Sequence, residues 1–144
     1  MSSWQTYAIR LALPDWRPQG LVDVDGRGLP RFPRLEAVPG FYRFRLGTDA
    51  FIGQSENLRQ RMALFRGWRE DRQDTHPDLY KGLRTGGTVL DVIDAATLDD
   101  TPLDLTSRAA REFVEGWLRL RERPNWNRDR WPEAILGDDD IGPV

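Results

Sequence analysis

The sequence has no cysteine and only one histidine, His76, among its 144 residues. Disulfide bonds, thiolate nucleophiles, cysteine-ligated zinc and sites built from two histidines are therefore excluded. A metal ion would have to be held by carboxylates and water, which suit magnesium or manganese. No apolar run approaches the roughly 18 residues that span a bilayer, and residues 1–6 lack the layout of a secretory signal. We expect a small cytoplasmic protein with one compact domain.

Lysine is almost absent as well, because Lys81 is the one lysine among 21 basic residues and the others are arginines. A guanidinium group binds two phosphate oxygens at once, although a GC-rich genome also enriches arginine. The net charge of −2 argues against a nucleic-acid partner, but part of the acidic excess lies at residues 138–140. Charge alone therefore leaves the partner open.

Prolines and glycines divide the chain into three parts. Residues 1–39 are rich in both and are expected to form an N-terminal extension packed on the core, with strands over residues 5–13 and 21–24. Residues 40–131 carry regular patterns and are expected to form the core domain. Residues 132–144 form an acidic C-terminal tail.

The core shows strand and helix patterns in a defined order. Alternation over residues 41–46 and 50–52 predicts a β-hairpin, and residues 88–93 are expected to form a third strand. Three helices are expected, over residues 56–70 with Ser55 as N-cap, over 74–84, and from Asp104 or Thr106 to 122 with Phe113, Trp117 and Leu120 on its apolar face. This order predicts a mixed α/β layer fold.

Two short motifs of glycine and aromatic residues lie in the two strands of the expected hairpin. The first is Gly-Phe-Tyr at residues 40–42, and the second is Phe-Ile-Gly at residues 51–53. Arg61 follows the glycine of the second motif by eight residues, on the helix that comes next. Each motif alone is weak, but their order and spacing strengthen one another.

A second group of residues lies near the end of the core. Glu115 on the long helix precedes Pro124 by nine residues, and Asn127 follows Pro124 by three. Together with the two motifs and Arg61, these residues resemble the GIY-YIG nuclease superfamily, and the resemblance covers roughly residues 40–127. It implies an α/β (α+β) fold with a small three-stranded antiparallel sheet flanked by helices and preceded by the N-terminal extension.

The resemblance also implies chemistry, because enzymes of this family cut phosphodiester bonds with one divalent metal ion. Arg61 would stabilise the negative charge that builds up on the phosphoryl oxygens. Glu115 would be the sole protein ligand of Mg2+ or Mn2+, with Glu112 as the alternative carboxylate. Tyr42 would activate or orient the attacking water, and it would need the metal and Arg61 close by to become a phenolate.

Five further positions complete the implied site. Asn127 would fix the loop or hold water, and Gly40 and Gly53 would give room to the backbone. Phe51 departs from the family, which usually has a second tyrosine there, so the hydroxyl is lost and activity is in doubt. His76 is a candidate to compensate, because an imidazole is a good proton acceptor near neutral pH.

Arginines and tryptophans are candidates for contact with nucleic acid. Arg59, Arg66 and Arg69 would form a stripe that follows phosphates if they share a face, although an ordinary solvated helix face explains them as well. Trp126 and Trp131 are expected to be exposed, where they would stack on bases. Each of these positions also has an ordinary structural explanation.

The sequence therefore predicts a metal-dependent endonuclease that hydrolyses DNA. The substrate is left open between single-stranded DNA, a branched structure and a duplex site read by a homodimer. The alternative is a catalytically weak or inactive nucleic-acid-binding module of the same fold, which Phe51 and the net charge favour. A third reading, a protein-interaction or toxin-type domain, has only the acidic tail behind it.

Overall fold

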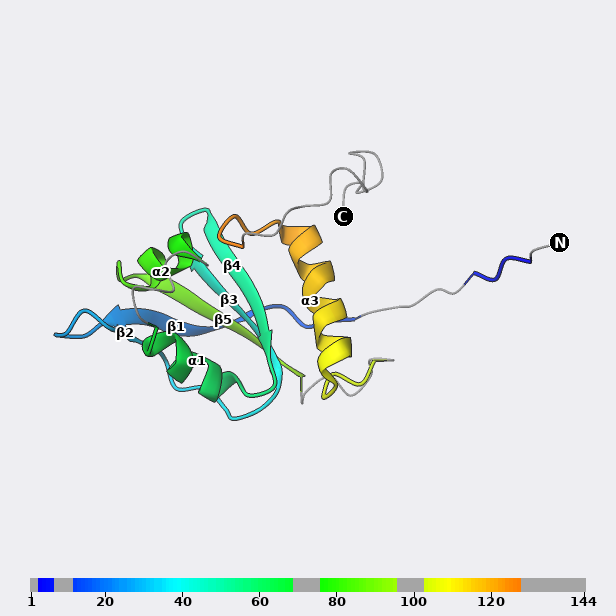
Figure 1. Ribbon diagram of the computed structural model, residues 1–144, viewed down its shortest axis with the longest axis horizontal. Coiled ribbons are helices and arrows are strands. Elements are labelled where there is room, and N and C mark those ends of the chain that lie inside the picture. The colour runs from blue at the N-terminus through cyan, green and yellow to red at the C-terminus, as the bar shows by residue number, and fades with distance from the viewer. Residues whose placement is uncertain (1–2, 7–11, 69–75, 96–102, 128–144) are drawn as a thin grey trace.

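The computed structural model describes residues 3–6, 12–68, 76–95 and 103–127, and the strands and helices in this part of the chain form one layered α+β fold (Figure 1). The elements in chain order are β1 (Arg17–Val24), β2 (Pro30–Arg31), β3 (Gly40–Leu46), β4 (Asp49–Ser55), α1 (Leu58–Arg66), α2 (Pro77–Leu83), β5 (Thr88–Asp94) and α3 (Arg108–Glu122).

The five strands form a single antiparallel sheet in the order β2-β1-β5-β3-β4. The predicted hairpin is the β3–β4 pair, in which Tyr42 lies opposite Gly53 and Phe44 opposite Phe51. β3 also pairs with β5 along its other edge. The strand that carries Tyr42 is therefore held on both sides, which fixes its position.

The expected three-stranded sheet is wrong, because the N-terminal segment adds β1 and β2 to it. Val22 of β1 lies opposite Thr88 of β5, and a bulge interrupts the pairing between Pro18 and Gly20. The expected strand over residues 21–24 lies within β1, but Pro18 and Gly20 hid its first half from pattern analysis. Val22 is the only fully buried residue of β1. Residues 5–6 and 12–13 of the expected first strand are not in a strand, and residues 7–11 lie outside the described residues.

Helices cover both faces of the sheet (Figure 1). Successive strand residues point to opposite faces, so the strands feed two separate clusters of buried side chains. One cluster joins Tyr42 and Phe44 to α1 and α2, and the other joins Phe41 and Ile52 to α3. The site residues of β3 and β4 are thus divided between the two layers.

The helix boundaries differ from the expected ones at their N-termini. Asn57, not Ser55, caps α1, since its side chain accepts a hydrogen bond from the Gln60 N–H. Ser107 caps α3 in the same way. Both helices are therefore shorter than expected. Each begins after the residue whose side chain accepts a hydrogen bond from the N–H of the third helical residue.

The buried face of α3 also differs from the expected one. Val114 and Leu118 are buried, whereas Phe113 is 59% exposed. Arg111 lies on the buried face too, where its guanidinium donates to the Gln54 side chain and to backbone carbonyl groups. The apolar pattern predicted the wrong face because Arg111, a charged residue, lies on the side of α3 that faces the core. Within the described residues, no helix combines the length and apolar character needed to cross a membrane.

A buried carboxylate ties the sheet to α3 on the second face. Asp91 of β5 is fully buried and accepts hydrogen bonds from Arg43 at 2.8 Å and from Arg45 at 2.5 and 3.1 Å. Arg43 also forms an ion pair of 2.6 Å with Glu122 at the end of α3 and lies over the ring of Trp16. Because a buried charge is costly without partners, this network fixes the register of β3, β5 and α3.

Trp126 is buried, not exposed as the sequence suggested. It is 5% exposed and packs in the cluster under α1 and α2. A Cβ atom on Gly82 of α2 would lie 2.3 Å from the indole ring. The glycine therefore allows α2 and the segment after α3 to approach each other closely.

We predict that Gly82→Ala destabilises the protein by about 2 kcal/mol, because the added methyl group overpacks the indole. Gly116→Ala on α3 is the matched control, since nothing lies within 4 Å of a Cβ at that position. Alanine should stabilise the helix there by roughly 0.5–1 kcal/mol. Urea unfolding measures both, and equal effects at the two positions would contradict the packing of Trp126 on Gly82.

Asp25 connects the β1–β2 turn to α1. Its carboxylate accepts from Arg66 Nη2 at 2.5 Å and from the N–H groups of Leu29 and Arg27. The Arg66 hydrogen bond, followed by the two backbone donors, lowers the pKa of Asp25 from 3.8 to about 2. The turn is thereby fixed against the helix.

This lowered pKa makes folding stability depend on pH. The stabilisation from Asp25 is fully present above the pKa of the unfolded carboxyl and is lost as pH falls from about 4 through about 2. Asp25→Asn should remove this part of the pH dependence. Acid unfolding curves of the two proteins that run parallel between pH 5 and 2, within error, would show that the interaction does not form.

Candidate active site

Two glycines make room for the centre of the candidate site. Tyr42 is 4% exposed, and a Cβ on its cross-strand neighbour Gly53 would lie 2.3 Å from the phenol oxygen. The phenol ring therefore lies across Gly53, where a side chain would collide with it. A Cβ on Gly40 would lie 2.6 Å from the Ile93 carbonyl oxygen and 2.8 Å from Leu58. Both glycines act by leaving space, as the sequence predicted.

Three charged side chains act on the phenol of Tyr42. Burial raises its pKa well above the usual range, the positive charge of Arg61 lowers it, Glu115 raises it and Arg119 lowers it. Burial has the largest effect, so Tyr42 is a neutral phenol near pH 7. The charges come from α1 and α3, which bring Arg61 and Glu115 to the same tyrosine. Arg119 was not anticipated, although its spacing of four residues from Glu115 on a helix is a usable signal.

Arg61 has a side-chain N–H donor without a hydrogen-bond partner among the described residues. Its Nε is buried and has no hydrogen-bond acceptor in the part of the chain that the structure describes. A buried donor without an acceptor costs about 1–3 kcal/mol. An anion bound here would supply the missing acceptor and a matching charge.

Glu115 is the more buried of the two candidate carboxylates on α3. Glu115 is 15% exposed and forms an ion pair of 3.2 Å with Arg119, whose guanidinium also donates to the Ile52 carbonyl oxygen. Glu112 is 52% exposed and pairs with Arg108 at 2.8 Å. The charge of Glu115 raises the pKa of the Tyr42 phenol, while Glu112 faces solvent.

The residues fit a metal ion held by one carboxylate. No group of three or more acidic or histidine side chains occurs among the residues that the structure describes, so a fully protein-ligated site is not formed by them. Mg2+ commonly takes one or two carboxylates and completes its shell with water and phosphate oxygens. Glu115, which pairs with Arg119, would supply one such hard oxygen donor.

Phe51 and His76 lie against each other. The Phe51 ring stacks on Tyr42 with centroids 6.2 Å apart, and His76 meets the same ring edge-on at 5.4 Å. His76 also stacks on Trp68 with an interplanar angle of 5°. The histidine, at the N-cap of α2, is thus in contact with the aromatic residue of the Phe-Ile-Gly motif.

Asn127 seals the edge of the sheet. Its side-chain amide accepts from the Ile52 N–H at 2.9 Å and donates to the Ile52 carbonyl oxygen at 2.8 Å. Asn125 accepts from the Ala50 N–H in the same manner, and the Trp126 N–H donates to the Ala50 carbonyl oxygen. β4 is an edge strand, so these bonds replace those of a further strand. Of the two roles expected for Asn127, these hydrogen bonds are those of holding the loop.

The arginines of the expected phosphate-binding stripe make intramolecular contacts. Arg59 donates to the Leu35 carbonyl oxygen at 2.8 Å, and Arg66 donates to the Pro30 carbonyl oxygen and to Asp25. They hold residues 25–35 against α1. Arg69 and Trp131 lie outside the described residues.

We predict that Asn127→Ala destabilises the protein by about 2–3 kcal/mol, because the buried Ile52 N–H then lacks an acceptor. Asn125→Ala is the matched control on the exposed end of the same segment and should cost no more than about 1 kcal/mol. Thermal unfolding compares them. Equal losses of stability would mean that the hydrogen bonds between Asn127 and Ile52 contribute no more than those of Asn125.

The arrangement comprises the half-buried Arg61, a carboxylate beside a second arginine, a neutral phenol and an imidazole. Such a set can bind an anion, hold one divalent cation and orient a water molecule. Comparisons with protein-family models, with curated proteins and with solved structures find no match for the chain, so a function must be argued from this geometry and from the sequence resemblance.

Proposed function

We propose that the chain is a metal-dependent endonuclease of the GIY-YIG type that hydrolyses DNA phosphodiester bonds. One observation carries the proposal. Arg61 on α1 and Glu115 on α3, 54 residues apart, both act electrostatically on the buried phenol of Tyr42, and the buried Nε of Arg61 has no acceptor among the described residues. A phosphate group is an anion that suits this donor.

Arg61 binds the scissile phosphate in this proposal. Attack by water forms a new P–O bond and breaks the bond to the leaving oxygen, and negative charge increases on the phosphoryl oxygens during the step. A cation already fixed in a buried position stabilises that charge without having to reorganise. The helix α1 and its Asn57 cap hold the arginine in place before the substrate arrives.

Tyr42 positions the water, and it does not remove its proton. Burial keeps its phenol protonated near neutral pH, so its oxygen accepts or donates a hydrogen bond without changing charge. His76, which meets the Phe51 ring edge-on, is the candidate that takes the proton of the attacking water. Glu115 would hold the metal ion, and a bound Mg2+ or Mn2+ would supply positive charge that stabilises the reacting phosphate.

A non-catalytic module that binds nucleic acid is the second candidate. Phe51 favours it, because the ring keeps its packing against Tyr42 but provides no hydroxyl. The ion pair of Glu115 with Arg119 would then be a purely structural contact. One experiment separates the two candidates.

We predict that Glu115→Gln lowers metal-dependent cleavage of labelled DNA at least ~100-fold, the usual effect of removing one preorganised charge from an active site. The substitution keeps the shape of the side chain and removes the charge. Cleavage of single-stranded and duplex DNA with Mg2+, with Mn2+ and with chelator provides the measurement.

Glu112→Gln is the matched control, since it removes the same charge one turn away on the solvent side of α3. It should cleave like the unchanged protein. If both variants cleave equally well, the assigned carboxylate is wrong. Salt-sensitive binding with no cleavage under any metal condition would favour the non-catalytic module.

A further inference from the structure

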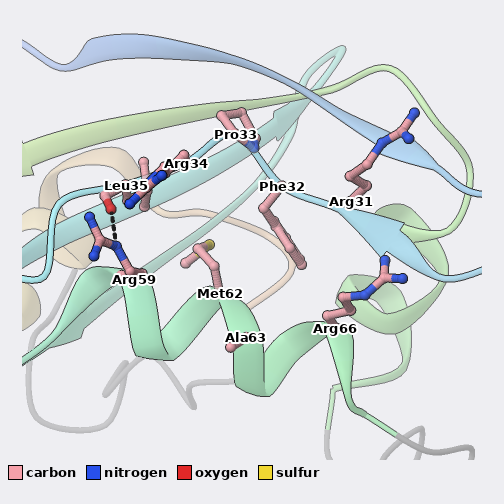
Figure 2. A pocket seen from close by; sticks show the side chains of 9 residues that line it. All are labelled: Arg31, Phe32, Pro33, Arg34, Leu35, Arg59, Met62, Ala63 and Arg66. Atoms are coloured by element: carbon pink, nitrogen blue, oxygen red, sulfur yellow. Dashed lines mark hydrogen bonds between the residues drawn. The ribbon is translucent and has the colours of Figure 1, made fainter.

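An open groove lies between α1 and the segment that follows β2. It has a volume of about 260 Å³. Figure 2 shows residues 31–35 crossing above α1, with Phe32 and Met62 pointing toward each other between them. The residues that line it are Arg31, Phe32, Pro33, Arg34, Leu35, Arg59, Met62, Ala63 and Arg66.

The rim of the groove is positively charged. It has four arginines and no acidic residue in its lining. Arg31 and Arg66 are paired outside the lining, with Asp23 at 3.8 Å and Asp25 at 2.5 Å. Arg59 uses its Nε for the Leu35 carbonyl oxygen, which leaves the end of its guanidinium for another group.

Arg34 adds a charge that the described residues do not neutralise. It is exposed, and no ion pair or hydrogen bond joins its side chain to another described residue. A ligand with at least one negative charge therefore complements this rim.

The floor of the groove is apolar and rigid. Phe32 is half-buried, and its ring lies 5.9 Å from that of Phe44 and 6.4 Å from that of Phe65, centroid to centroid. Met62 is buried in the same cluster. A nucleotide matches both parts of the groove. Its base can stack on the aromatic and apolar side chains of the floor, while the arginines of the rim bind the phosphate backbone.

The groove and the candidate site lie on opposite flanks of one helix. Arg59, Met62, Ala63 and Arg66 face the groove. Arg61 does not line it, lies about 100° from Met62 around the helix, and acts electrostatically on Tyr42. A helix is roughly 10–12 Å wide with its side chains. A strand that lies over α1 therefore spans both features within a few nucleotides.

We propose that this groove binds an unpaired nucleotide of single-stranded DNA, with the base against Phe32 and the flanking phosphates on Arg34 and Arg59. The proposal rests on the proposed function for its choice of DNA. An unpaired base can leave its neighbours and enter a recess, whereas a stacked base pair presents only the phosphate backbone to this surface. The N-terminal segment thereby selects single-stranded substrates.

The test measures the binding of a fluorescent oligothymidylate of about 12 nucleotides by fluorescence anisotropy. A chelator is present so that nothing is cut. Arg34→Ala should weaken binding about fivefold and reduce the slope of log K against log salt by about 0.7. Arg17→Ala removes an equal charge from an exposed strand residue that does not line the groove, and it should bind like the unchanged protein.

Ala63→Leu tests the recess without changing charge. The exposed Ala63 lines the groove on α1, so a larger side chain fills it, while Ala109→Leu makes the same change on an exposed turn of α3. The first should weaken binding and the second should not. A duplex of the same length should bind more weakly and without dependence on Ala63.

The outcomes separate this proposal from the nuclease itself. If Arg34→Ala and Ala63→Leu bind the oligonucleotide as the unchanged protein does, or if nothing binds, the groove proposal is overturned even where cleavage is observed. If binding depends on both residues and no cleavage occurs with any metal, the groove proposal holds and the nuclease proposal fails.

Discussion

The outward-facing backbone groups of β4 are the constraint on which the site depends. An edge strand must find partners for its N–H and carbonyl groups, and here side-chain amides from the segment after α3 provide them at Ala50 and Ile52. Meeting this requirement fixes the end of α3 beside β4. As a consequence, Arg119 reaches the Ile52 carbonyl oxygen and Glu115 comes close enough to affect the Tyr42 phenol.

The site is built from two layers that meet around this edge. Tyr42, Phe51 and His76 belong to the layer under α1 and α2, while Glu115 comes from the helix on the other face. A glycine at position 53 leaves the strand edge bare enough for the tyrosine ring to lie across it. Charge from one layer therefore acts on a phenol buried in the other, which neither layer would achieve alone.

Local patterns predicted the local structure, and distant contacts decided the rest. The β3–β4 hairpin, α2 and β5 follow from alternation and from Pro77, whose fixed backbone suits the first turn of a helix. Trp126 was misjudged because two asparagines flank it, and only contacts with residues 75 positions away reveal that those amides bind a strand. The same holds for Arg111, a charged residue whose partners lie on β4 and before α3. The motif spacing selected Arg61 and Glu115, whose charges both act on the phenol of Tyr42, but it did not select Arg119, whose charge acts on the same phenol.

The place of β1 in the sheet sets an order for folding. Val22 pairs with Thr88, so the strand that is synthesised first among these elements has no neighbour at β5 until most of the chain has been made. The hairpin of β3 and β4 and the helix α1 need only nearby residues and can form earlier. Pairings between distant segments are slow because the intervening chain must first be closed into a loop. On the ribosome, the edge of β1 that pairs with β5 therefore has no partner until β5 has been made. The arginine-rimmed groove depends on the segment after β1 and is completed near the end of folding.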